Sequence, residues 1–285
     1  MKTLKNPMLQ LALIIVLPAM LFTACQKKQD DLAAGVQGVN IYLTDDPSFV
    51  FDNIYLDIQS VEIKMKDSLE HNGSGHDGSN GDDNGGASSA WIKLQSRTGV
   101  YDILKFRNGL DTLFSTGSVM STKKLSKVRI TLGSNNSLVY NGAKFSLSLK
   151  KAFVIINLED ELVEQQNGGT VHLWLDFDAG RSIRKEGNQF VLEPKLKCFS
   201  KTKSGAIEGR VLPDAARAIV MAINGTDTST AKPEREGEFK IAGLKAGTYR
   251  LLVKATAGGY IDATVPNVVV RTKDDTNVGT IVLHQ

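Results

Sequence analysis

Cysteine and histidine are scarce in this chain. Its 285 residues include two cysteines, Cys25 and Cys198, and four histidines. Two cysteines cannot build the disulfide framework that stabilises small secreted domains, so the fold must depend on its hydrophobic core. Cys198 lies in a strand-like segment, and we expect it to be a small buried hydrophobe.

Signatures of common enzyme classes are also missing from the sequence. It contains no HExxH, no GxSxG, no Walker A motif and no GxGxxG that opens a helix. No basic run with interleaved aromatics is present either. Once Lys2 and Lys5 are removed with the leader described next, 32 basic residues face 31 acidic ones. This near-neutral balance argues against nucleic acid as a partner.

The first 24 residues have the three-part layout of a secretory signal. Lys2 and Lys5 precede an apolar run at 8–22, and small residues then lead into Cys25. The stretch resembles the lipobox of bacterial lipoproteins, although Phe22 replaces the usual leucine. That resemblance implies that residues 1–24 are a lipoprotein signal peptide and that the thiol of Cys25 is lipidated.

Two other interpretations of the leader are a plain signal peptide and a short membrane helix. The apolar run is short for a membrane span and is interrupted by Gln10 and Pro18. We interpret 25–35 as a polar tether. Asp30 and Asp31 resemble the signal that exports some Bacteroidetes-type lipoproteins to the cell surface, but a solvated tether explains them equally well.

The remainder of the chain predicts an all-β protein with two β-sandwich domains, at 36–200 and 205–285. Short segments with apolar residues at every second position recur along it, separated by turn residues. Within 54–65 the apolar residues change from even-numbered to odd-numbered positions, which predicts a β-bulge or a bend near Gln59–Ser60. Asn141 and Gly142 predict a hairpin turn. The continuous apolar run 153–158 predicts a strand covered on both faces.

Residues 71–89 form a low-complexity stretch of Gly, Ser, Asp and Asn. It has no apolar anchor, so we expect a disordered insertion in a hairpin. The alternative is a calcium loop that uses Asp77, Asp82 and Asp83, because calcium prefers oxygen ligands. The order of acids and glycines does not fit an EF-hand.

The segment 169–181 contains the best candidate for a binding face. The odd-numbered residues 171–177 are apolar, whereas the even-numbered positions are His172, Trp174, Asp176 and Asp178. Successive side chains of a strand point to opposite faces, so these two sets lie on opposite sides. Such a face could bind a sugar ring or a metal. However, a lone histidine beside two acids is weak evidence for a metal site, and Trp174 could instead be covered by a neighbouring loop.

Five segments that occur in order give the first domain a specific resemblance. They are 42–47 (YLTDDP), 54–65, 104–109 (LKFRNG), 130–133 (ITLG) and 174–183 (WLDFDAGRSI). Together they resemble the lipoprotein family built on the domain of unknown function numbered four-three-eight-two. The resemblance implies a β-rich sandwich in exported bacterial lipoproteins and brings no catalytic residues.

The second domain resembles a different module. Six strand candidates lie within 205–285, and the pattern GEFKIAGLKAGTY at 237–249 is similar to that of transthyretin-like, carboxypeptidase-regulatory β-sandwiches. We expect the alternating apolar residues here to point inward: Phe239, Ile241, Tyr249, Leu251 and Val253. Such modules are usually spacers, and the resemblance implies no peptidase.

We therefore expect a lipid-anchored outer-membrane protein, facing the periplasm or the exterior, with a non-catalytic binding or structural role and no cofactor. Its partner would be a glycan or another envelope protein. One alternative is a glycan-acting enzyme that uses Asp176 or Asp178 with a second acid opposite. Another is an assembly subunit that pairs through its edge strands.

Overall fold

The computed structural model describes residues 35–46, 51–67, 90–159 and 169–285. All of these residues belong to one compact unit. The predicted leader, Cys25 and most of the tether lie outside the described residues, and so do the insertion 71–89 and the calcium candidates Asp77, Asp82 and Asp83. Among the described residues, no helix combines the length and apolarity that crossing a bilayer requires.

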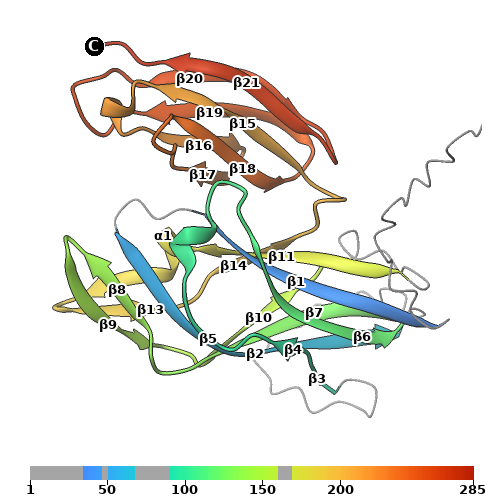
Figure 1. The fold of residues 1–285 in the computed structure, drawn as a ribbon. Coiled ribbons are helices and arrows are strands. Elements are labelled where there is room, and N and C mark those ends of the chain that lie inside the picture. The colour runs from blue at the N-terminus through green and yellow to red at the C-terminus, as the bar shows by residue number, and fades with distance from the viewer. Residues whose placement is uncertain (1–34, 47–50, 68–89, 160–168) are drawn as a thin grey trace, which may run out of the picture. The chain divides into compact units, whose positions relative to one another are not determined.

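The N-terminal part of the described chain is a sandwich of two sheets (Figure 1). The smaller sheet has the order β14-β11-β1-β6-β4, and the larger has β10-β7-β2-β8-β9-β13-β12, with β3 and β5 also paired to β2. The strands are β1 (Val36–Asp46), β2 (Asn53–Asp67), β3 (Ile92–Lys93), β4 (Gln95–Ser96), β5 (Gly99–Asp102), β6 (Thr112–Met120), β7 (Lys123–Leu132), β8 (Ser137–Tyr140), β9 (Ala143–Leu149), β10 (Phe153–Asn157), β11 (Thr170–Asp178), β12 (Ile183–Glu186), β13 (Gln189–Leu192) and β14 (Leu196–Phe199).

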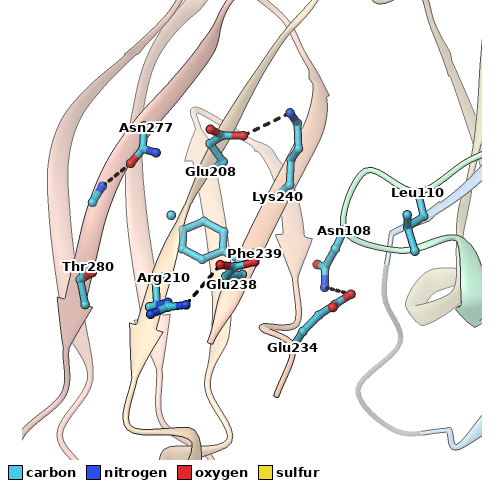
Figure 2. Close-up of a pocket in the computed structure, with 12 residues that line it drawn as sticks. Asn108, Leu110, Glu208, Arg210, Glu234, Glu238, Phe239, Lys240, Asn277 and Thr280 are labelled. Atoms are coloured by element: carbon cyan, nitrogen blue, oxygen red, sulfur yellow. Dashed lines mark hydrogen bonds and ion pairs between the residues drawn. The ribbon is translucent and has the colours of Figure 1, made fainter. Parts of the chain in front are cut away.

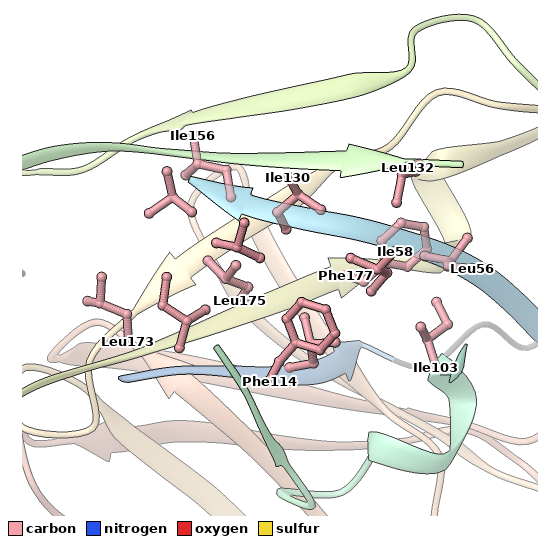
Figure 3. Close-up of a cluster of buried hydrophobic side chains, with 14 of the residues drawn as sticks. Leu56, Ile58, Ile103, Phe114, Ile130, Leu132, Ile156, Leu173, Leu175 and Phe177 are labelled. Carbon is pink, nitrogen blue, oxygen red and sulfur yellow. The ribbon is translucent and has the colours of Figure 1, made fainter. Parts of the chain in front are cut away.

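The core of this sandwich lies between the two sheets. Side chains from both sheets meet there, as Figure 3 shows for Ile130 and Leu132 of β7 and for Leu173 and Leu175 of β11. Leu173 and Leu175 are completely buried. The apolar parity of 169–181 therefore faces the core, as the alternation predicts.

The predicted irregularity in β2 is confirmed. The β2–β7 register shifts between Ile58 and Ser60. Because of this shift, residues of both parities are buried on one face: Ile54, Leu56, Ile58, Val61, Ile63 and Met65.

A buried carboxylate fixes the chain beside the bulge. Asp57 is 4% exposed and accepts hydrogen bonds from the Gln59 side chain and from the backbone N–H of Asn135. A Cβ at Gly133 would lie 2.2 Å from Asp57 Oδ2. A side chain at position 133 would therefore clash with the Asp57 carboxylate, which favours glycine there.

The predicted hairpin is confirmed. Strands β8 and β9 pair in antiparallel register up to Tyr140 and Ala143. Asn141 and Gly142 both have positive φ, 50° and 76°. Two positive φ values at the two central residues of the turn are what a two-residue hairpin of this type requires.

The expectation that 153–158 is covered on both faces is wrong. Strand β10 lies at the edge of the larger sheet and pairs with β7 on one side. Phe153 and Ile155 remain 47% and 42% exposed. A continuous apolar run does not distinguish a central strand from an edge strand, because position in the sheet depends on which other segments pair with it.

The C-terminal part is a second sandwich, whose strands are drawn from orange to red in Figure 1. Its sheets have the orders β18-β15-β21 and β17-β16-β19-β20. The strands are β15 (Gly205–Leu212), β16 (Ile219–Asn224), β17 (Asp227–Ala231), β18 (Glu238–Leu244), β19 (Gly247–Lys254), β20 (Ala263–Val270) and β21 (Asp275–Val282). The six-strand expectation missed β17, whose sequence DTSTA is almost wholly polar.

The second sandwich has its own buried core. Phe239, Ile241, Tyr249, Leu251 and Val253 are all at most 6% exposed, which confirms the inward set predicted from the alternation. Helices in the described residues are single turns: η1 (Ile103–Phe106), α1 (Ala179–Ser182) and η3 (Asp214–Ala216). The prediction of an all-β, sandwich-type protein is therefore confirmed.

Candidate functional site

The candidate face lies on the outer side of the smaller sheet of the first sandwich. Strand β1 pairs with β11 in parallel register, which places Tyr42 beside Trp174. On its other side β11 pairs with β14, which places Phe199 beside Trp174. Neighbouring residues in register point to the same face of a sheet, so the three aromatic side chains form one row.

The three rings of this row are stacked. The centroids of Tyr42 and Trp174 lie 4.7 Å apart, with an angle of 9° between their planes. Those of Trp174 and Phe199 lie 6.0 Å apart at 20°. Trp174 is only 9% exposed and Phe199 only 7%. A ring so enclosed offers little free surface for stacking on a sugar.

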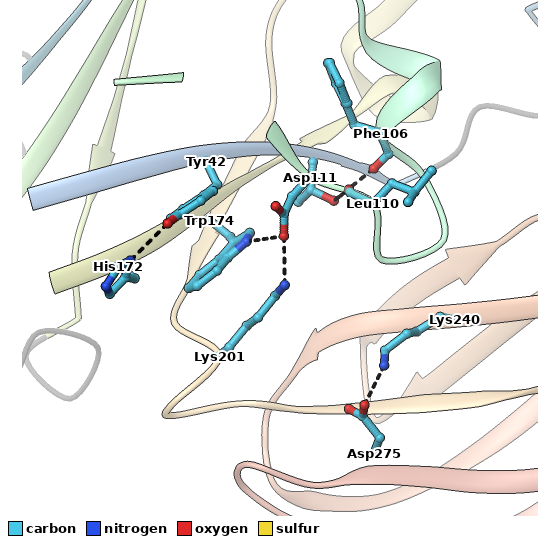
Figure 4. A network of polar contacts seen from close by, with 10 residues as sticks. Tyr42, Phe106, Leu110, Asp111, His172, Trp174, Lys201, Lys240 and Asp275 are labelled. Carbon is cyan, nitrogen blue, oxygen red and sulfur yellow. Dashed lines mark hydrogen bonds and ion pairs between the residues drawn. The ribbon is translucent and has the colours of Figure 1, made fainter. Parts of the chain in front are cut away.

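The polar atom of Trp174 is also satisfied within the protein. Its indole Nε1–H donates a hydrogen bond to Asp111 Oδ2 at 2.7 Å (Figure 4). Lys201 Nζ donates to the same oxygen at 2.7 Å and lies 4.6 Å from the centroid of the indole ring. A buried indole N–H usually has such a partner, and the lysine adds a cation–π contact.

The segment that provides Asp111 is attached to the sheet by a threonine of β1. The Thr44 hydroxyl lies 3.0 Å from the carbonyl oxygen of Phe106 and 3.1 Å from that of Leu110, and can donate to either. Thr44 is 8% exposed. This attachment fixes the chain between η1 and β6, so that Asp111 reaches Trp174.

His172 lies at the exposed end of the row. Its Nδ1 is 3.1 Å from the hydroxyl of Tyr42, and its ring centroid is 5.9 Å from that of Tyr42. Partial burial lowers the pKa of the His172 imidazole, because burial disfavours the charged form. The hydroxyl of Tyr42 and the imidazole of His172 are thus the accessible polar groups of the row.

The two acids of the predicted face have different environments. Asp178 is 8% exposed and caps α1: its Oδ1 accepts from the backbone N–H of Arg181 at 2.9 Å, and its Oδ2 accepts from the guanidinium Nε of that arginine. Asp176 is half-buried and lies in register with Thr44 and Lys197. The structure thus places the rings of His172 and Trp174 side by side, with centroids 6.3 Å apart. The side chain of Asp178 instead caps a helix.

Cys198 is half-buried on β14, and its burial raises the pKa of the thiol to about 12. Such a thiol stays protonated and is a poor nucleophile at neutral pH. Within 35–46, 51–67, 90–159 and 169–285, no three His, Cys, Asp or Glu residues cluster in a way that could hold a metal ion.

A second concave region, of about 640 Å³, involves the three-stranded sheet of the second sandwich (Figure 2). Four of the five charged side chains that line it form ion pairs, and Glu234 accepts a hydrogen bond from the Asn108 amide. Lys240 Nζ lies 3.2 Å from Glu208, and an Arg210 guanidinium nitrogen lies 3.2 Å from Glu238. Each of the two cations that line the region is therefore paired with an acid.

Sequence reasoning did not identify the residues that enclose Trp174. Alternation places Tyr42 on the outer face, but the pairing of β1 with β11 joins segments about 130 residues apart. Asp111 lies outside regular structure, and Lys201 lies between the two predicted domains. No local signal in the sequence connects these three residues.

The model of one protein family, described as "Domain of unknown function (DUF4382)", matches residues 38–194. This match covers more than half of the chain. A search of curated proteins finds no match.

Solved structures give only distant similarities. A type II cohesin–X-dockerin complex from Acetivibrio cellulolyticus matches with 24% identity and a TM-score of 0.23, over 28% of this chain and 56% of that one. The Bacillus anthracis TIE protein matches with 10% identity and a TM-score of 0.21, over 87% and 34%. A variant of the shaft pilin SpaA from Lactobacillus rhamnosus GG matches with 10% identity and a TM-score of 0.24, over 88% and 97%.

This chain thus spans little more than half the length of the first of these structures. TM-scores this low carry no argument about function.

Proposed function

This chain belongs to the family of the domain of unknown function DUF4382, and from that premise we propose that it is a lipid-anchored cell-envelope protein with a non-catalytic binding or structural role. The matched family supplies no reaction and no catalytic residues. The proposal therefore depends on the chain's own residues.

The non-catalytic part of the proposal rests on the hydrogen bonds that the candidate residues make within the fold. Both carboxylate oxygens of Asp178 accept hydrogen bonds from Arg181. Trp174 is buried and bound to Asp111. A glycosidase needs two carboxyl groups that face each other across the substrate. Since both oxygens of Asp178 hold a helix terminus, Asp178 is not available as the second acid beside Asp176.

The anchored part rests on the leader and Cys25 of the sequence, and the start of the described fold limits how far the sandwich can lie from a lipid there. The backbone N–H of Ser121 donates to Gly35 O at 2.9 Å, so the chain enters the first sandwich beside the turn between β6 and β7. Between Cys25 and Gly35 an extended chain can span at most about 35 Å. A lipid on Cys25 would therefore hold the sandwich close to the outer membrane.

Replacing Cys25 by alanine tests the anchor. In the full-length chain expressed in a diderm bacterium, we expect Cys25→Ala to abolish palmitate incorporation. The protein should then remain uncleaved or become soluble, because this thiol would carry the diacyl group. The measurement is palmitate labelling together with membrane fractionation.

The other cysteine provides the matched control for this test. Cys198→Ala should be labelled and fractionate like the wild type, because its thiol lies on β14 and is not part of the leader. Equal labelling of Cys25→Ala and the wild type would refute the anchor.

A glycan array probed with the full-length chain in detergent distinguishes binding from catalysis. We expect retained glycans to stay intact, and we expect Asp176→Asn to retain them as the wild type does. Glycan cleavage that Asp176→Asn abolishes would establish the rival enzymatic role. The array is run with and without calcium, so that a metal requirement of Asp77, Asp82 and Asp83 is detected in the same experiment.

A further inference from the structure

Strand β10 leaves an apolar edge on the larger sheet of the first sandwich. It pairs with β7, and no other described strand pairs with it. Its outward side chains Phe153 and Ile155 are 47% and 42% exposed. An exposed apolar edge strand is a template for pairing with another chain, and natural proteins normally protect such edges.

The hydrogen bonds to β7 show which backbone groups of β10 face outward. Leu132 N–H donates to Ala152 O at 2.7 Å, and Leu158 N–H donates to Ser126 O at 2.8 Å. In an antiparallel pair, alternate residues direct their N–H and C=O groups toward the partner strand. The even-numbered residues therefore face β7, and the N–H and C=O groups of Phe153, Ile155 and Asn157 face away from it.

We propose that β10 pairs with β10 of a second copy of this chain, in antiparallel register about a two-fold axis at Ile155. In this register Ile155 lies opposite its own copy, and Phe153 lies opposite Asn157. The backbone groups that face outward are those such pairing uses, which gives about six hydrogen bonds between the chains. A two-fold axis makes the two contact surfaces identical.

Charge complementarity identifies a second copy as the occupant. When the pairing continues two residues past each end of β10, the same register places Lys151 of one copy opposite Glu159 of the other. Both residues are exposed, and both are odd-numbered like Phe153 and Ile155, so all four share one side of the extended strand. Opposite charges on directly opposed residues stabilise strand pairs. A shift by one residue would separate these charges and move Ile155 away from its copy.

Glu159 already has one cationic neighbour, but it remains accessible. Its carboxylate lies 3.1 Å from Lys245 Nζ, with 58% of the Glu159 side chain and 74% of the Lys245 side chain exposed. An exposed carboxylate can accept a second cation, so the Lys245 contact does not exclude Lys151 of the partner.

Sedimentation of residues 26–285 tests the association. This fragment contains every described element and the compact unit Leu32–Gln285. We expect the wild type to form dimers and Ile155→Lys to weaken dimerisation at least tenfold, because it places two like charges on the axis. Ile261→Lys, at a position 65% exposed in the second sandwich, should dimerise normally.

Cysteine cross-linking in a Cys198→Ser background tests the register. Opposed residues in a hydrogen-bonded pair have Cα atoms about 5.5 Å apart, which suits a disulfide. We expect Ile155→Cys to give a cross-linked dimer under mild oxidation. Asn157→Cys alone should not, because its two copies would lie about 13 Å apart along the strands. Combining Phe153→Cys with Asn157→Cys should restore cross-linking.

Three outcomes would overturn the proposal: a wild-type fragment that is monomeric at every concentration, an Ile155→Lys variant that dimerises like the wild type, or cross-linking of Asn157→Cys in place of Ile155→Cys. Pairing of β10 with a strand of another protein would appear as the first outcome. The fragment lacks Cys25, so these results are independent of the lipid anchor.

Discussion

Replacing Trp174 with alanine should lower the free energy of unfolding by about 3–5 kcal/mol, as truncation of large aromatic side chains in packed interiors does. The ring is 9% exposed and stacks on Tyr42 with centroids 4.7 Å apart. The variant also loses the hydrogen bond from Nε1 to Asp111 and the contact with Lys201. Urea unfolding followed by circular dichroism measures the change.

Two variants on the same face make this result interpretable. His172→Ala changes an exposed neighbour two residues away on β11 and should cost no more than about 1 kcal/mol. Trp174→Phe keeps an aromatic ring but removes the N–H donor, and it should have an intermediate effect.

A Trp174→Ala variant that unfolds at the wild-type urea concentration would contradict the structural role of this side chain. If that variant also lost a glycan or protein ligand, Trp174 would instead be the binding residue that the sequence pattern suggested.

Leu173→Ala should cost about 2–5 kcal/mol, because it removes a large side chain from a close-packed interior and leaves a cavity. Leu173 is completely buried and points from β11 into the core between the two sheets (Figure 3). Urea unfolding again provides the measurement, and the slope against denaturant shows whether the variant still unfolds like the wild type.

Leu110→Ala is the matched control, since it makes the same chemical change at a leucine that is 56% exposed. Its main-chain carbonyl, within hydrogen-bonding distance of Thr44, is unaffected by the substitution. We expect a loss within about 0.5 kcal/mol. Equal losses in the two variants would mean that β11 does not face the core as described.

Several features of the secondary structure could be predicted from local patterns in the sequence. The structure contains three of them: the buried odd-numbered residues of β11, the irregularity in β2, and the turn at Asn141 and Gly142. Each of these features depends on residues within a few positions of one another. Side-chain alternation and positive φ at a turn are properties of the local backbone, so they can be recognised without knowing which strands pair.

Strand pairing could not be predicted in the same way. The run 153–158 is as apolar as a central strand, yet β10 is an edge strand. The polar segment Asp227–Ala231 has no strand pattern, yet it becomes β17 because β16 pairs with it. Position within a sheet depends on contacts between distant segments, which local composition does not encode.

From the sequence alone it follows that this is a β protein and which residues of β11 face the core. The sequence also shows that His172, Trp174, Asp176 and Asp178 share the other side of that strand. The surroundings of Trp174, by contrast, follow from contacts between distant segments. Parallel pairing of β1 with β11 places Tyr42 on Trp174, the segment fixed by Thr44 brings Asp111 to the indole, and Lys201 closes over it. These groups come from four separate parts of the chain, so their meeting depends on the free energy of the whole fold and not on any local preference.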